Sequence, residues 1–192
     1  MRSATISRKT KETDITLSLN LDGGEVSVDT GVGFFDHMLT SFAVHGGFGL
    51  NVKCVGDLRV DEHHTVEDVG IVLGSAFNES LGDKSSIERF GSFYVPMDEA
   101  LAFASVDVSG RAYLVYDANY PQECCGTYNT AMTWEFMRAF AFNANITLHT
   151  KVLYGNNSHH MVEAMFKAVA HAMRLAVKEN NSNVPLSTKG VL

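Results

Sequence analysis

The sequence predicts a mixed protein of the α/β or α+β class, and two observations carry this prediction. Apolar residues recur at every second position, as in strands, in both halves of the 192-residue chain. Other segments show the three-to-four-residue apolar spacing of helices. With 45% hydrophobic and 19% charged residues, the composition is that of a globular protein with a sizeable core.

The first predicted strand covers residues 13–21, where Ile and Leu alternate with polar side chains. Asp22-Gly23-Gly24 follows, and we expect this turn to form a hairpin into a strand that contains Val26 and Val28. Further strands are predicted at residues 102–108 and 112–116, separated by Gly110.

Two helices are predicted from apolar spacing over residues 66–77 and 162–177. Asp61 and Ser158 stand where helix N-caps are expected. The chain has only three prolines and no low-complexity linker, so we expect no independently mobile domain. We divide it into two α/β halves, residues 1–92 and residues 93–192.

Charge and hydropathy exclude several classes of function. No run of 18 apolar residues could span a bilayer, and the basic start leads into no signal-peptide segment, so a cytoplasmic protein without a membrane partner is expected. A formal net charge of -7 argues against a general nucleic-acid binder. Three cysteines without CxxC spacing are expected to be reduced thiols.

The most informative feature is an internal repeat. His63-His64-Thr65-Val66-Glu67 in the first half matches His159-His160-Met161-Val162-Glu163 in the second, and each is preceded by another possible ligand, His37 or Glu135. Residues i and i+4 share one helical face, whereas residue i+1 points about 100° away. Each histidine doublet could therefore serve two different metal ions.

The two copies supply four imidazoles and two carboxylates, and His37 and Glu135 raise the total to eight ligands, enough for two ions with positions left for water or substrate. These ligands suit Mn, Fe or Zn, and the residues alone do not choose among the three. A single such motif could equally be a surface helix, but its duplication favours a metal site. Asp68 is either an outer partner of a ligating histidine or an ordinary first-turn acid.

Several basic residues could hold a phosphate group. These are Arg89, Arg111, Lys167 and Lys189, the last in the polar segment Ser187-Thr188-Lys189-Gly190. By composition alone, each is more commonly a solvated surface charge.

The chain resembles the imidazoleglycerol-phosphate dehydratase family over nearly its whole length. The most specific matches are GVGFFDHML (31–39), DEHHTVED (61–68), PMDEA (96–100) and HHMVEAMFKA (159–168). The resemblance implies an α+β fold, an α/β sandwich of two duplicated halves, each with a small β-sheet packed against a pair of helices, as in the second domain of a ribosomal protein. It also implies a homo-oligomeric shell of 24 subunits with sites between neighbouring chains.

The resemblance further implies two Mn²⁺ ions per active site. Metal ligands carried over are His37, His63, His64, Glu67, His159, His160 and Glu163. Glu135 is a further candidate, although many family members have histidine at this position, so metal affinity or preference could differ.

The implied substrate is imidazoleglycerol phosphate, an intermediate of histidine biosynthesis. Substrate-binding roles are expected for Glu12, His37, His45, His63, Glu67, Arg89, Arg111, His159, Lys167, Ser187, Thr188 and Lys189. Catalytic roles are expected for Glu12, His64 and His160, with Glu12 as the candidate that moves a proton.

The metals would stabilise negative charge on the substrate's imidazole ring while water is lost and imidazole acetol phosphate forms. Two alternatives remain open at this point. A dinuclear metallohydrolase could use the same ligands to activate water. A non-catalytic metal-binding or storage assembly could use them merely to hold ions.

Overall fold

The computed structural model describes residues 2–180, 182, 184 and 186–190. Its two halves repeat one order of elements. The first half contains β1 (Ser3–Lys9), β2 (Thr13–Asn20), β3 (Val26–Asp29), α1 (Gly33–Gly46), β4 (Gly49–Gly56) and α2 (His63–Ser80). The second contains β5 (Phe90–Met97), β6 (Ala100–Asp107), β7 (Tyr113–Asp117), α3 (Met132–Asn143), β10 (Thr147–Tyr154) and α4 (Ser158–Ala176). The short strands β8 (Cys124–Cys125) and β9 (Tyr128–Asn129) precede α3.

Each half builds a sheet with the same topology. The strand orders are β1-β2-β4-β3 and β5-β6-β10-β7. In both sheets the last strand of the order is parallel to its neighbour, and the other pairs are antiparallel. The α+β fold of two duplicated halves is therefore confirmed. The second sheet begins with β5, so the expected boundary at residue 92 falls inside this strand.

The hairpin expected at residues 22–24 is wrong. Val26 pairs in parallel with Leu50 of β4, whereas β2 pairs with β1 and β4. The glycines do make a turn, but β4 lies between the two strands that the turn connects. Leu50, Val52 and Cys54 of β4 are fully or almost fully buried, so one face of this central strand packs against the core.

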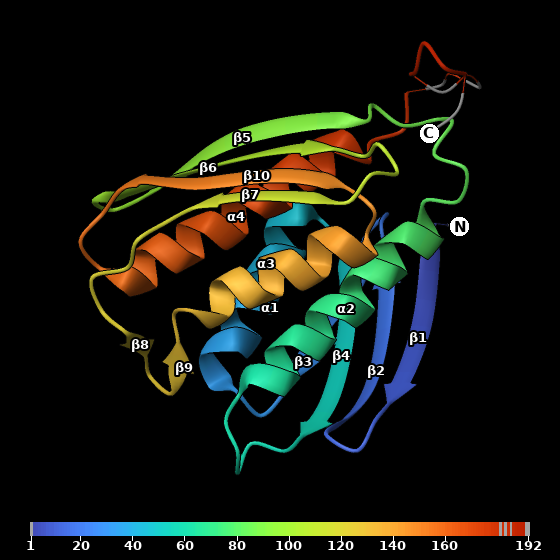
Figure 1. The fold of residues 1–192 in the computed structure, drawn as a ribbon. Helices are drawn as coiled ribbons and strands as arrows, with labels where there is room; N and C mark the ends of the chain where they lie inside the picture. Colours follow the sequence, from blue (N-terminus) through green and yellow to red (C-terminus); the bar gives the residue numbers. More distant parts are fainter. Residues whose placement is uncertain (1, 181, 183, 185, 191–192) are drawn as a thin grey trace.

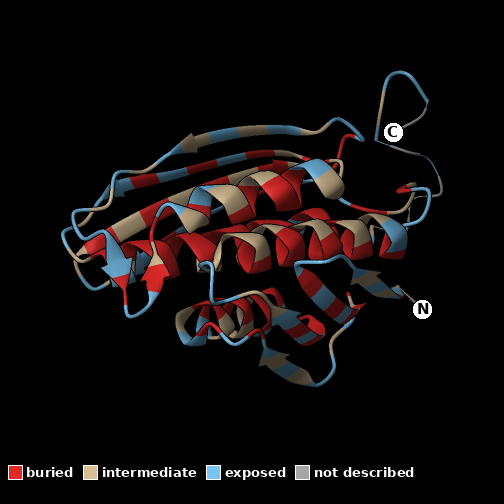
Figure 2. Ribbon diagram, turned by 60° about the horizontal axis from the view of Figure 1, so that its bottom comes forward, coloured by how far each residue is buried: buried red, intermediate tan, exposed pale blue. Residues whose placement is uncertain are grey.

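The helices lie between the two sheets (Figure 1). α2 contacts β1 and β2, and α4 contacts β5 and β6. The halves meet where α1 contacts α4 and α2 contacts α3. Buried residues are concentrated along the helices, while the strands alternate buried and exposed positions (Figure 2). Each sheet therefore presents one face to the shared core and the other to solvent.

Two glycines allow α2 and α3 to approach closely. A Cβ atom on Gly70 would lie 2.9 Å from the Cβ of Ala139, and one on Gly74 would lie 2.5 Å from the carbonyl oxygen of Phe140. Larger side chains at these positions would separate the helices. This contact brings the start of α2 beside the start of α3.

Asx side chains fix the starts of the two histidine-bearing helices. The carboxylate of Asp61 accepts a hydrogen bond of 2.8 Å from the backbone N–H of His63, but the N-cap residue of α2 is Glu62, so the prediction of Asp61 as this cap is wrong by one residue. Asn157 accepts one of 3.0 Å from the N–H of His159 and is the N-cap of α4. The prediction of Ser158 as this cap is wrong, because Ser158 is already helical and its hydroxyl is hydrogen-bonded to the backbone of Gln122. Among the described residues, no helix is both long and apolar enough for a bilayer crossing.

Candidate metal centre

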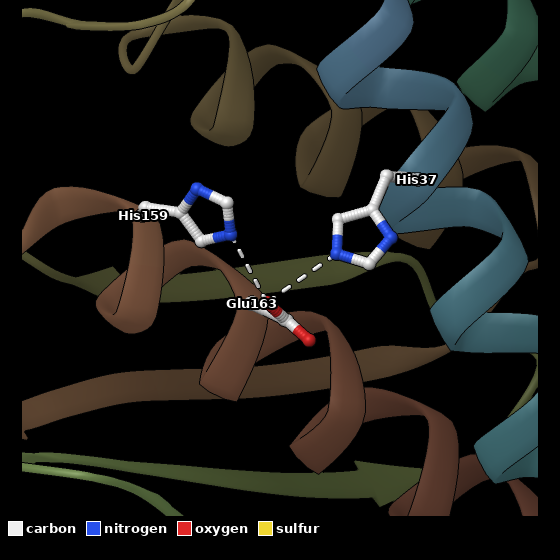
Figure 3. Close-up of side chains that lie close together, drawn as sticks. All are labelled: His37, His159 and Glu163. Atoms are coloured by element: carbon white, nitrogen blue, oxygen red, sulfur yellow. Dashed lines mark ion pairs between the residues drawn. The ribbon is translucent and has the colours of Figure 1, made fainter.

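Two helices from different halves bring His37, His159 and Glu163 together; we call these three residues the first ligand group. Nε2 of His37, on α1, lies 3.4 Å from Oε2 of Glu163, and Nε2 of His159 lies 3.2 Å from the same oxygen. Both rings face the Glu163 carboxylate (Figure 3). One ligand atom from each residue lies within 4.8 Å of the other two, an arrangement able to hold a divalent cation.

Lys167 completes the surroundings of Glu163. Its Nζ lies 2.8 Å from Oε1, so the lysine pairs with one carboxylate oxygen while the histidines face the other. Burial favours the neutral acid, but Lys167 and His37 outweigh this effect and lower the pKa of Glu163 below its ordinary value. The carboxylate is therefore ionised and ready to bind a cation at neutral pH.

The repeated motif of the first half forms a second ligand group, which comprises His63, Glu67 and Glu135. Nε2 of His63 lies 3.7 Å from Oε2 of Glu67. Glu135 joins them through Arg138, whose Nη2 lies 2.5 Å from Oε1 of Glu67 and 3.3 Å from Oε2 of Glu135. Within the described ranges, three such ligand atoms come within 4.8 Å of one another only in the first ligand group.

His64 and His160, the second member of each doublet, have carboxylate partners of their own. Nδ1 of His64 lies 3.0 Å from Oδ2 of Asp57, and Nδ1 of His160 lies 2.8 Å from Oε2 of Glu99. These hydrogen bonds raise the pKa of each histidine and lower the pKa of Glu99 to about 2. Nε2 of each ring has only a longer carboxylate contact, 3.8 Å to Glu12 for His64 and 3.7 Å to Asp98 for His160, and is the nitrogen able to bind a metal.

Three residues of these surroundings were missed by the sequence analysis. Glu99 lies inside the PMDEA match, so its place in that motif was the available signal. Arg138 follows Glu135 by three residues, the spacing of an ion pair on one helical face, and this was the available signal. Asp57 stands in no repeated spacing that could have marked it. Their roles depend on the turn after β4 and on the contact between α2 and α3.

Asp68 does not orient a ligating histidine. Its carboxylate is buried, forms an ion pair with Arg8, and accepts a hydrogen bond from the hydroxyl of Thr13. It therefore ties α2 to β1 and β2, and the proposed outer-partner role is replaced by a structural one.

The structure places the residues predicted to contact phosphate in two separate regions. Arg89 donates to both oxygens of Asp107, at 2.7 Å from Nε and 3.1 Å from Nη2, and lines a pocket with Ser187 and Thr188. Nη2 of Arg111 lies 3.8 Å from the same carboxylate. Lys189 follows in the exposed tail. Lys167 instead lies beside Glu163.

The Arg89 pocket and the first ligand group stand at opposite ends of α4. The N–H of Arg89 donates to the carbonyl of Ala176, the last residue of α4, whereas His159 is in its first turn. At 1.5 Å per residue, the two ends are separated by about 25 Å. A small molecule therefore cannot contact both within one chain.

His45 and Glu12 take separate positions. His45, in the last turn of α1, has its ring centroid 5.4 Å from that of His171 on α4, and burial, followed by the charge of Lys167, lowers its pKa. Glu12 lies in the turn between β1 and β2 with Oε1 3.8 Å from Nε2 of His64. Of the expected catalytic residues, Glu12 and His64 are thus neighbours, and His160 is in the other half.

The fold and the two ligand groups define the class of protein. It is a duplicated α+β protein with imidazole and carboxylate side chains at the starts of paired helices. The sequence profile described as "Imidazoleglycerol-phosphate dehydratase" matches residues 30–173. The chain therefore belongs to the imidazoleglycerol-phosphate dehydratase family, and it is an enzyme of the hydro-lyase class.

Relatives and solved structures agree with this placement. The imidazoleglycerol-phosphate dehydratase of Acetivibrio thermocellus is 58% identical over 193 residues, covering 100% of this chain and 99% of that protein. The protein of the same name from Lacticaseibacillus casei is 56% identical, with 100% of both chains covered. The crystal structure of the Staphylococcus aureus enzyme superposes with a TM-score of 0.85 at 39% identity, covering 93% of this chain and 99% of that one.

Proposed function

We propose that the chain removes water from imidazoleglycerol phosphate to give imidazole acetol phosphate, a step of histidine biosynthesis in the cytoplasm, and that it needs two Mn²⁺ ions per active site. The observation that carries the metal requirement is the first ligand group, where two imidazoles face one ionised carboxylate. The substrate follows from the names of the full-length relatives.

The donor atoms fit a hard or borderline divalent cation. Imidazole nitrogens and carboxylate oxygens suit Mn, and no thiolate takes part among the residues described. Three protein ligands leave open positions, as catalytic sites require. When bound, the metals supply Lewis-acid stabilisation of negative charge on the imidazole ring of the substrate.

The chain's own residues supply position and proton transfer. Asp57 and Glu99 hold His64 and His160 in the tautomer that leaves Nε2 free for a metal. Glu12 lies beside the Nε2 edge of His64, where a carboxylate can accept or return a proton of the substrate. Arg89, Arg111, Ser187, Thr188 and Lys189 are the groups proposed to bind the phosphate.

We also propose that each complete site draws residues from more than one chain. The Arg89 pocket is about 25 Å from the first ligand group along α4, too far for one small substrate to reach both. Neighbouring copies of the chain can bring the two regions together. By family resemblance the assembly has 24 subunits.

The test is to strip the protein with a chelator, restore it with Mn²⁺, and measure imidazole acetol phosphate formed from imidazoleglycerol phosphate. Product that depends on added metal supports the proposal. Release of inorganic phosphate from simple esters without the dehydration product would instead favour a dinuclear hydrolase. Stoichiometric metal binding with neither product would favour a storage role.

A further inference from the structure

The two ligand groups are related by the internal duplication but differ at one position. α1 is followed by Gly47 and α3 by Asn145, both in the left-handed region with φ of 71° and 53°. His37 and Glu135 fall at the same spacing before these two residues. Where the first ligand group has an imidazole, the second therefore has a carboxylate.

A carboxylate at this position is repelled by the neighbouring Glu67 carboxylate, whereas a neutral imidazole is not. Glu135 and Glu67 both face the contact between α2 and α3, and two like charges sharing a site repel each other. Arg138 follows Glu135 by one helical turn, whereas the equivalent position of α1 holds Thr40. At this helix position a cation therefore accompanies only the extra carboxylate, whereas the cation of the first ligand group, Lys167, comes from α4.

Arg138 is held by three contacts with carboxylate oxygens and one with an aromatic ring. Its Nη2 lies 2.5 Å from Oε1 of Glu67 and 3.3 Å from Oε2 of Glu135, and its Nε lies 3.4 Å from the latter oxygen. Its guanidinium carbon also lies 5.5 Å from the centroid of the Trp134 ring, within the range of a cation–π contact. The guanidinium therefore contacts one oxygen of each carboxylate, Oε1 of Glu67 and Oε2 of Glu135.

In the first ligand group the neighbouring cation contacts a single carboxylate, not two. Lys167 pairs with Oε1 of Glu163, and Oε2 stays between the two histidines. In the second group Oε2 of Glu67 likewise faces His63, but Oε2 of Glu135 is bound by Arg138. A cation that binds Glu135 through Oε2 must displace the guanidinium from that oxygen.

We propose that Arg138 is a built-in counter-ion of the second ligand group. It holds Glu67 and Glu135 together in the metal-free protein and leaves Glu135 when a divalent cation binds there. The first ligand group consequently fills before the second. This inference rests on the proposed metal-binding role of both groups.

Metal titration of the chelator-stripped, full-length protein tests the inference, with Arg138→Gln as the main variant. In the unaltered protein we expect a tight and a weaker class of Mn²⁺ site by isothermal calorimetry. Arg138→Gln should tighten the weaker class by about tenfold or more, the scale on which groups beside metal ligands change affinity. The tight class should keep its affinity.

Two control variants distinguish an effect of the Arg138 charge on metal binding from a general loss of protein stability. Arg138→Lys keeps a cation on α3 and should leave two separable classes. Lys151→Gln removes an exposed ion pair between Lys151 on β10 and Asp117 on β7, and both classes of site in this variant should match the unaltered protein. Equal or weaker binding by Arg138→Gln in the second class would overturn the inference.

Tryptophan fluorescence provides a readout in the unaltered protein, because Trp134 is the only tryptophan. With diamagnetic Zn²⁺ as the probe, which avoids paramagnetic quenching, emission should change as the weaker class fills and not before. A change that accompanies the tight class would contradict the loading order. Absence of any metal binding would instead refute the proposed function itself.

Discussion

Nδ1 of His160 lies 2.8 Å from Oε2 of Glu99, a carboxylate that also accepts the backbone N–H groups of Asn156 and Asn157. Glu99 is thereby fixed at the start of α4 and fixes the histidine ring in turn. His64 has an equivalent partner in Asp57. The duplication therefore extends to the carboxylates behind the proposed metal ligands, although these two acids come from different loops.

Replacing Glu99 with Gln should lower the pKa of His160 in the metal-free protein. The hydrogen bond from Glu99 favours the protonated ring, so the folded pKa is above the ordinary 6.5 and the ring stays charged at higher pH than a free histidine. NMR titration of ring resonances measures the shift.

Asp57→Asn is the matched control for that titration. It should lower the pKa of His64 and leave that of His160 unchanged. Protons compete with the metal for these nitrogens, and the pKa of His160 is above 6.5. When the pH is lowered, Mn²⁺ binding by the unaltered protein should therefore start to weaken before the pH reaches 6.5. A His160 pKa that does not move in Glu99→Gln would contradict the assignment.

Replacing Glu163 with Gln should remove the tight Mn²⁺ site. The neutral amide lacks the charge that Lys167 and the two histidines surround, and we expect affinity to fall by more than about tenfold. Equilibrium dialysis with metal analysis measures the loss. Glu25→Gln, an exposed change of the same kind, should bind as the unaltered protein does; equal affinity in both variants would refute the role of Glu163.

Gly74→Ala should destabilise the protein although alanine favours helices. The added Cβ would lie 2.5 Å from the carbonyl oxygen of Phe140 and 2.8 Å from the N of Ala144, so α2 and α3 must move apart. Overpacking of this kind costs about 1–3 kcal/mol. Thermal unfolding measures it. At Gly33, the first residue of α1, a Cβ meets no atom within 4 Å, so Gly33→Ala should be neutral or slightly stabilising.

Asp107→Asn should weaken substrate binding more than turnover. The two hydrogen bonds from Arg89 to this carboxylate hold the guanidinium beside the Ser187 and Thr188 pocket, and the neutral amide cannot accept both. We expect KM to rise by about tenfold, which corresponds to roughly 1.4 kcal/mol. Asp117→Asn, which breaks an exposed pair with Lys151, is the control. An unchanged KM in Asp107→Asn would remove Arg89 from the phosphate site.

The sequence predicted the parts of this molecule that repeat at fixed spacing. The alternation around Leu17 and the helical pattern around Val169 both lie in the elements expected. The pairing of strands was harder to predict from the sequence. The glycine turn before Val26 shows that the chain reverses, but it does not show that β4 lies between β2 and β3. Pairing over such distances depends on the whole sheet.

In the candidate site, too, contacts within one helix could be predicted and contacts between distant segments could not. His159 and Glu163 share a helical face and meet as their spacing predicts. The meeting of His37 with them depends on the crossing of α1 and α4, which spacing within one segment does not report. Arg138 escaped notice for the same reason, since its partner Glu67 belongs to the opposite half.

The proposal that a complete site needs more than one chain is tested most directly by complementation. His159→Ala and Arg89→Ala, each expected to be inactive alone, would be co-expressed with different affinity tags, and assemblies that carry both tags would be purified and assayed with Mn²⁺. If His159 of one chain acts with Arg89 of another, mixed assemblies contain some intact sites and dehydration of imidazoleglycerol phosphate returns. Mixed assemblies as inactive as either parent would show that both residues must come from the same chain, contrary to the separation along α4.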